Sequence, residues 1–191
     1  MKKTLLILLF VALLMHVPGL FASSHADESR QQRAVLVTGA STGIGRRIAE
    51  DLAEKGFYVF AGARKQQDLD ALNDIPNIQA VRLDVTVQDE IDAAVQTVAD
   101  SGKGLYGLVN NAGVFIGGPL IEVDVAEFEW LMDVNVTGVY RVTQAFAPMI
   151  IESQGRISTI GSISGNGSGR FFSQYSMSKH AMEAFTDTLA I

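Results

Sequence analysis

The stretch Val35-Leu36-Val37-Thr38-Gly39-Ala40-Ser41-Thr42-Gly43-Ile44-Gly45 decides the fold of this chain. An apolar, β-branched run is followed by a glycine-rich turn and then by apolar residues at helical spacing, which predicts a strand, a tight turn and a helix in direct succession. In such a unit the free N–H groups at the helix start favour an anion, and a dinucleotide pyrophosphate binds there. Glycine needed only for close backbone packing is the alternative.

The turn residues are expected to have separate roles. Gly39 permits the tight turn, whereas Gly43 and Gly45 allow the helix and the backbone to approach closely. The predicted cofactor-binding residues of the turn are Gly39, Ser41, Thr42, Gly43, Ile44 and Gly45.

Strand and helix patterns alternate through the rest of the chain, which is typical of βαβ units. The expected helices have one face with Ile44, Ile48 and Leu52, another with Ile91, Val95 and Val98, and two further segments at 126–152 and 175–190. We therefore predict an α/β fold, a Rossmann-like doubly wound parallel sheet, in one domain over residues 33–191. The predicted strands are 34–37, 58–61, 78–83, 107–109 and 156–159.

Charge and composition exclude several function classes. The 191 residues include 15 Lys and Arg against 21 Asp and Glu, for a net charge of −6, so the chain lacks the positive field that attracts nucleic acid. It has 0 Cys and 3 His, which argues against a disulfide framework and a zinc-centred chemistry. We predict no nucleic-acid partner and no metal site.

Residues 1–26 differ from the rest of the chain. Two lysines precede an unbroken apolar run over residues 5–15, and the segment ends in small residues with Ser24-x-Ala26. This is typical of a secretory signal peptide cleaved after Ala26. An uncleaved membrane anchor through residues 4–22 is one alternative, and a buried or mis-started N-terminus is another. The first two interpretations predict an exported (periplasmic or lumenal) or membrane-anchored domain.

The end of the second predicted strand bears on the cofactor. An acidic residue there would bind the 2′-hydroxyl of an unphosphorylated ribose, but the chain has Arg64 and Lys65. The planar guanidinium of Arg64 suits a 2′-phosphate. The sequence therefore favours NADP, with NAD, or a solvated pair of cations, as the alternatives.

Tyr175 and Lys179 place a phenol and an ammonium on one face of a predicted helix, since residues four positions apart are neighbours there. A nearby positive charge favours the phenolate and suits the group to proton transfer. Such a pair is also common on helix surfaces, so its interpretation depends on the other motifs.

Those motifs make residues 34–191 resemble the short-chain dehydrogenase/reductase family, in the branch with a Y-x-x-x-K active site. The resemblance implies hydride transfer between a nicotinamide cofactor and a small-molecule carbonyl or alcohol. The residues that carry it are Thr38-Gly39-x-x-x-Gly43-Ile44-Gly45, Asn110-Asn111-Ala112-Gly113, and the set Asn135, Ser162, Tyr175 and Lys179 at the family's spacing.

The resemblance also implies a role for each catalytic residue. Tyr175 is the acid/base group, and Lys179 favours its phenolate and binds the nicotinamide ribose. Ser162 holds the substrate oxygen, and Asn135 anchors a water in the proton path from Lys179.

Further cofactor contacts are implied at the ends of the third and fourth strands. Asp84-Val85 contacts the adenine end, and residues 110–113 flank the cofactor. A helix N-cap or loop carboxylate is the alternative for Asp84. Beyond the glycine turn, the predicted cofactor-binding residues are Arg64, Asp84, Val85, Asn111, Ala112, Gly113, Tyr175 and Lys179.

Other side chains carry weaker predictions. Phe171 and Phe172 are predicted to line an apolar pocket, which favours an apolar substrate, with inward packing of both rings as the alternative. Trp130 and the phenylalanines are expected in the core. His180 is expected to be structural or solvated, because it lies off the Tyr175/Lys179 face.

The length limits the enzyme prediction. A doubly wound dinucleotide fold has six strands, and this chain offers candidates for five before it stops inside the helix that begins near Tyr175. We expect the sixth strand and a substrate-covering segment to be missing, and this chain alone to be aggregated or inactive. A catalytically impaired or non-catalytic nucleotide-binding module is the alternative function. The full-length protein is expected to form a homo-oligomer.

Overall fold

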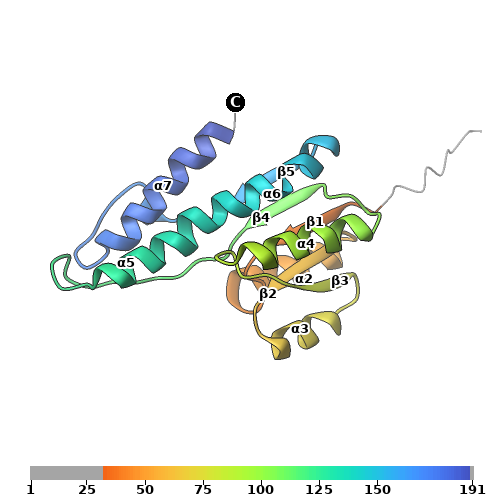
Figure 1. The fold of residues 1–191 in the computed structure, drawn as a ribbon, viewed down its shortest axis with the longest axis horizontal. Helices are drawn as coiled ribbons and strands as arrows, with labels where there is room; N and C mark the ends of the chain where they lie inside the picture. Colours follow the sequence, from red (N-terminus) through yellow and green to blue (C-terminus); the bar gives the residue numbers. More distant parts are fainter. Residues whose placement is uncertain (1–31, 190–191) are drawn as a thin grey trace, which may run out of the picture. The chain divides into compact units, whose positions relative to one another are not determined.

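Five parallel strands form one sheet in the order β3-β2-β1-β4-β5 (Figure 1). The structure, a computed structural model, describes residues 32–189, so the leader or anchor predicted within residues 1–26 lies outside the described residues. All five predicted strands are present, and three of them differ from the predicted bounds by one or two residues. The strands are β1 (Ala34–Val37), β2 (Tyr58–Ala63), β3 (Ile78–Arg82), β4 (Gly107–Asn110) and β5 (Arg156–Thr159).

Helices cover both faces of this sheet, as the doubly wound prediction requires. The alternating side chains of β1 enter two different cores: Leu36 packs with α4 (Gln88–Asp100) and α6 (Gly138–Glu152), whereas Val37 packs with α2 (Gly43–Glu54) and α3 (Gln66–Asn73). Because successive strand residues face opposite ways, a strand covered on both faces is apolar throughout. The four residues of β1 are all buried.

The helices depart from prediction in three places. Helix α3 was not predicted, because its two buried residues, Leu69 and Leu72, give little periodicity within eight residues. The segment predicted as one helix over 126–152 contains α5 (Val125–Met132), a π-helical turn (Asp133–Thr137) and α6. The buried face of α2 is Gly45, Ala49 and Ala53, with Ile48 and Leu52 partly buried, so the prediction for Ile44 was wrong.

The last helix, α7 (Ser173–Leu189), contacts α5, the π-helical turn and a short 3₁₀ helix (Ile163–Gly165) that follows β5. Within residues 32–189, β5 is an edge strand that pairs with β4 alone, and its side chains alternate between exposed and half-buried. None of the helices described is both long and apolar enough to span a membrane.

Candidate functional site

The carboxyl ends of all five strands open into one cleft with a volume of about 620 Å³. Since the strands are parallel, the turns that follow them meet at one edge of the sheet. Along that edge, the turns after β3 and β2 lie at one end, and the turn after β5 lies at the other. The predicted residues that line the cleft are Gly39, Ser41, Thr42, Ile44, Gly45, Arg64, Asp84, Val85, Asn111, Ala112, Gly113, Ser162, Tyr175 and Lys179.

Two glycines allow the turn after β1 to pack tightly against the turn after β4. Gly39 has a φ of +64°, and a Cβ there would lie 2.8 Å from the Cα of Ala112. A Cβ on Gly45 would collide with the Nδ2 of Asn111 and the carbonyl of Gly39. Both positions therefore require glycine, in agreement with the close approach that the sequence predicts.

Thr38 and Asn111 join the same two turns by hydrogen bonds. The backbone N–H groups of Asn111 and Ala112 both donate to the Oγ1 of Thr38, at 3.0 Å each. The Nδ2 of Asn111 donates to the carbonyls of Thr38 at 2.9 Å and of Gly39 at 3.0 Å. This role of Thr38 was not predicted, although a hydroxyl at the end of a buried strand needs a partner.

The N-terminus of α2 faces this cleft. No side chain caps it, since Thr42 makes no hydrogen bond to the first turn. The first N–H groups of a helix have no partner within the helix, and together with the dipole they attract an anion. Ile44, which is 63% exposed, lies in this turn and lines the cleft, which explains why it is absent from the core.

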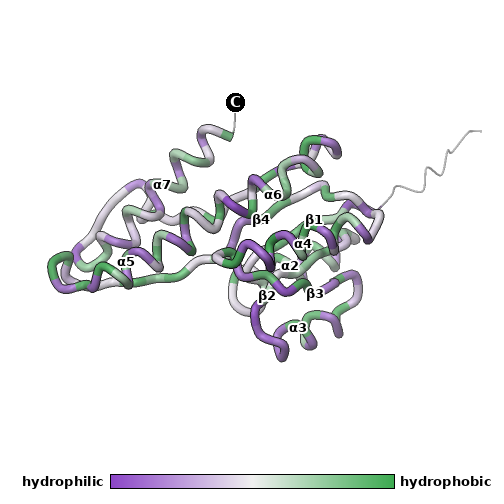
Figure 2. Tube along the Cα trace, in the orientation of Figure 1, coloured by the Kyte–Doolittle hydropathy of each residue, from purple (hydrophilic) through white to green (hydrophobic). Residues whose placement is uncertain are grey.

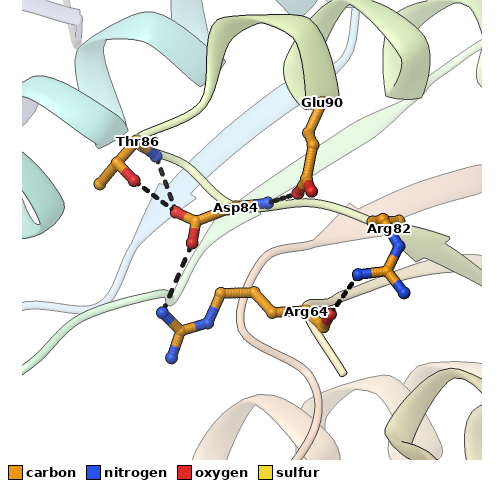
Figure 3. Close-up of polar contacts among 5 residues, drawn as sticks. All are labelled: Arg64, Arg82, Asp84, Thr86 and Glu90. Carbon is orange, nitrogen blue, oxygen red and sulfur yellow. Dashed lines mark hydrogen bonds and ion pairs between the residues drawn. The ribbon is translucent and has the colours of Figure 1, made fainter. Parts of the chain in front are cut away.

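Arg64 and Asp84 meet at the β2–β3 end of the cleft (Figure 3). An Nη1 of Arg64 lies 3.5 Å from the Oδ2 of Asp84, and the other carboxylate oxygen accepts the backbone N–H and the hydroxyl of Thr86 at 3.0 and 2.7 Å. Burial acts to raise the pKa of Asp84, but the Thr86 bonds and the Arg64 charge outweigh it and hold that pKa below its usual value. The carboxylate is therefore kept ionised beside the guanidinium.

Tyr175, Lys179 and Ser162 line the opposite end. The Nζ of Lys179 lies 5.8 Å from the ring centroid of Tyr175 and donates to the carbonyl of Ile160 at 2.7 Å. Burial lowers the pKa of Lys179, an effect that the carboxylate of Glu183, one turn along α7, partly opposes. The Oγ of Ser162 accepts the backbone N–H of Ser164 at 3.1 Å.

Asn135 contacts the loop and the helix that form this end but does not line the cleft. It is buried in the π-helical turn, where its Oδ1 accepts the N–H of Val114 at 2.8 Å and its Nδ2 donates to the carbonyl of Val114 at 2.9 Å. The same Nδ2 donates to the Oγ of Ser178 at 3.1 Å. Asn135 thus links the loop after β4 to α7. A π-helical turn within a helical segment is frequent at functional sites.

Phe115 is a cleft residue that sequence analysis missed. Its ring meets that of Tyr175 edge-on, with centroids 5.1 Å apart, and lies 5.4 Å from the ring of Phe172. No periodic pattern marks the loop after β4, so only its position behind the Asn-Asn-Ala-Gly motif could have indicated this residue. Figure 2 shows further hydrophobic residues in the loop that leads into α5, which follows Phe115 in the sequence.

Some predicted residues lie elsewhere. Gly43 and Asn135 are not among the described residues that line the cleft, and the side chain of Asn110 donates instead to Thr143 of α6 at 2.9 Å. The prediction that Trp130 is in the core was wrong: it is 48% exposed, because α5 buries only Leu131.

The aromatic side chains and His180 divide between the core and the surface. Phe60 and Phe146 are buried, whereas Phe115 is exposed, so the core prediction was wrong for Phe115. Phe171 and Phe172, predicted to line an apolar pocket or to pack inward, are both exposed, and neither is among the residues that line the cleft. His180 is exposed, and its Nδ1 lies 2.8 Å from the carbonyl of Ser176.

Comparison with known proteins identifies the family. The model of the short chain dehydrogenase family matches residues 33–191. The chain belongs to the short-chain dehydrogenase family. It is 35% identical over 167 residues to the mitochondrial D-beta-hydroxybutyrate dehydrogenase of Bos taurus, covering 82% of this chain and 48% of that protein. The chain spans about half the length of this relative and of the corresponding enzymes of Rattus norvegicus and Mus musculus.

Solved structures of short-chain dehydrogenases have the same fold. A variant of actinorhodin polyketide ketoreductase with NADPH superposes with a TM-score of 0.80 at 33% identity, covering 84% of this chain and 64% of that one. A short-chain dehydrogenase/reductase from Burkholderia phymatum in complex with NAD gives 0.78 at 28% identity, covering 83% and 59%.

The cleft fits a dinucleotide. Its volume of about 620 Å³ lies in the range of cofactor sites. A Cβ at Gly39 or Gly45 would fill the space between the glycine turn and the turn after β4, and the uncapped start of α2 supplies donors for a pyrophosphate. Among residues 32–189, by contrast, no three acidic, His or Cys side chains are grouped as metal ligands.

Proposed function

We propose that this short-chain dehydrogenase is an NADP-preferring oxidoreductase that interconverts a carbonyl and an alcohol. The observation that carries the proposal is that Tyr175, Lys179 and Ser162 line the same cleft as the glycine turn. When bound, the nicotinamide cofactor supplies or accepts the hydride. The protein contributes position and a proton.

Tyr175 is the acid/base group in this proposal. Its hydroxyl gives a proton to the carbonyl oxygen during reduction and takes it back during oxidation. Lys179 is one helical turn away, with its Nζ 5.8 Å from the ring centroid of Tyr175, and its positive charge stabilises the negative charge that develops on the phenol oxygen during proton transfer. Ser162, which follows β5 and lines the same end of the cleft, donates to the same substrate oxygen, which orients the carbonyl toward Tyr175.

Asn135 has an indirect role. By binding both backbone groups of Val114 it fixes the loop from which Phe115 reaches the ring of Tyr175. We assign Asn135 as a positioning residue for the catalytic end. We also propose that it anchors a water in the proton path from Lys179, as the family resemblance implies.

The preference for NADP rests on Arg64. Its side chain is 61% exposed at the cleft, and the contact at 3.5 Å to Asp84 occupies only part of a guanidinium that has five N–H donors. A planar guanidinium binds a phosphate through paired hydrogen bonds. The remaining donors of Arg64 therefore suit the 2′-phosphate that distinguishes NADP from NAD.

The substrate is expected to carry an apolar group beside its carbonyl. Phe115 contacts Tyr175 and Phe172, and both phenylalanines are exposed, at 56% and 43%. Exposed aromatic rings next to a reactive hydroxyl gain free energy when an apolar substrate covers them. We infer a preference for ketones with an alkyl or aromatic flank.

Turnover and binding are tested together. NADPH binding is measured by titration, and NADPH absorbance is followed with a panel of aliphatic and aromatic ketones. We expect Tyr175→Phe to lower turnover by about 100- to 10,000-fold, the contribution of a positioned acid, with NADPH affinity changed less than about twofold. Tyr140→Phe, at an exposed tyrosine of α6, is the matched control.

Three outcomes contradict parts of the proposal. Full turnover in Tyr175→Phe removes Tyr175 as the acid. Binding of NADPH without turnover on any ketone favours a nucleotide-binding module without catalysis. The absence of binding at millimolar cofactor excludes both functions for this chain.

A further inference from the structure

Arg82 lies outside the cleft and yet binds the turn that carries Arg64 (Figure 3). It is the last residue of β3, directly opposite Ala63, the last residue of β2. An Nη1 of Arg82 donates to the backbone carbonyl of Arg64, and its Nη2 donates to the Oε1 of Gln66 at 3.2 Å. One guanidinium therefore spans the connection between β2 and α3.

Arg64 is consequently held at two separate points. Arg82 binds its backbone carbonyl, and Asp84 binds its guanidinium at 3.5 Å. Arg82 is the last residue of β3 and Asp84 follows it two positions later, so the end of one strand supplies both contacts to Arg64. The carboxylate of Asp84 is itself fixed by Thr86, and its backbone N–H donates to Glu90 at 2.7 Å.

The charge of Arg82 is not neutralised by the contacts that it makes. Both of its acceptors are uncharged, and no carboxylate lies within ion-pair distance of it among the described residues. Asp84 supplies one negative charge beside the two guanidinium groups, so one positive charge remains, and the repulsion between the two arginines costs Coulomb energy. That cost is offset if the pair serves a site for a strongly anionic group.

We propose that Arg82 is a positioning residue that sets the direction of Arg64 toward the 2′-phosphate of NADP. This inference rests on the proposed preference for NADP. Arg82 acts through the backbone of Arg64 and does not touch the phosphate, because its own side chain lies outside the cleft lining. Loss of Arg82 therefore removes this contact with the turn that carries Arg64, and the preference for a phosphorylated ribose becomes weaker.

The test measures binding of adenosine 2′,5′-bisphosphate and of adenosine 5′-monophosphate to the whole chain by isothermal titration calorimetry. These probes differ only in the 2′-phosphate and need no turnover. Arg82→Met is expected to weaken the bisphosphate about tenfold and the monophosphate less than about twofold. The unchanged monophosphate affinity shows that the variant is folded at the site.

Three further variants decide how Arg82 acts. Arg64→Met is expected to weaken the bisphosphate by more than Arg82→Met does, and Arg64→Met with Arg82→Met to weaken it no further than Arg64→Met alone. Arg156→Met is the matched control, because Arg156 also donates to the carbonyls of a turn, Gln154 and Gly155, but at the opposite end of the strands. We expect both affinities to be unchanged in it.

The outcomes separate the two proposals. An unchanged ratio of the two affinities in Arg64→Met overturns the NADP preference itself. A reduced ratio in Arg64→Met with an unchanged ratio in Arg82→Met overturns only the role of Arg82. Additive losses in the double variant show that Arg82 acts directly on the phosphate, and they also overturn the positioning role.

Discussion

The two ends of the cleft are built differently. The β2–β3 end contains an ion pair between two side chains in addition to its backbone contacts: Arg64, 61% exposed, lies 3.5 Å from Asp84. At the catalytic end, the polar side chains bind backbone groups, as Lys179 binds the carbonyl of Ile160 and Asn135 binds both backbone groups of Val114. Backbone partners do not change with the sequence, whereas side-chain partners do. We infer that substitutions at the β2–β3 end can change what that end binds, whereas substitutions at the catalytic end lower turnover or stability.

Lys179→Met gives the largest expected effect at the catalytic end. Lys179 is only 9% exposed, so its ammonium acts on Tyr175 with little screening by water. We expect turnover to fall about 100-fold or more, within the range for disrupted proton transfer. Lys55→Met, at an exposed lysine after α2, is the control, and steady-state kinetics with saturating NADPH is the measurement. Equal turnover in both variants would remove Lys179 from the mechanism.

The two ends also differ in how much of each could be predicted from the sequence. The glycine turn, Tyr175 and Lys179 are contiguous motifs, and the parallel topology brings them to one edge, so their place in the cleft was accessible from the sequence. The contact of Arg82 with the carbonyl of Arg64 was not, because it depends on the register of β2 and β3 and on a backbone acceptor that is present at every residue.

Two other features escaped prediction for related reasons. The contact between Phe115 and Tyr175 joins positions far apart in the sequence, and the loop that carries Phe115 has no periodic pattern. The π-helical turn around Asn135 interrupts a segment whose apolar spacing predicts one continuous helix. Both features arise from tertiary packing, which local propensity does not encode.

Asn135→Leu tests whether backbone anchoring holds the catalytic end. The substitution leaves the partly buried N–H and carbonyl of Val114 without their partner, and each such loss costs up to about 1–3 kcal/mol. We expect the free energy of unfolding in urea to fall by about 2–4 kcal/mol. Asn166→Leu, at an exposed asparagine after the 3₁₀ helix, should change it by less than about 0.5 kcal/mol. Equal stability of both variants would contradict the anchoring role.

Asp84→Asn gives the smallest effect and probes the β2–β3 end. Because the pKa of Asp84 is lowered in the folded protein, its ionised form stabilises the fold at pH values above the usual 3.8, and this contribution is lost as the pH falls through the lowered folded-state pKa. The Asn variant should therefore be less stable at neutral pH, by under about 1 kcal/mol for a partly exposed pair. The difference in Tm from the natural chain should close in acid. Asp187→Asn, at an exposed carboxylate near the end of α7, is the control. A difference that stays constant from neutral pH into acid would show that Asp84 contributes by packing and not by its charge, and would remove the electrostatic distinction between the two ends.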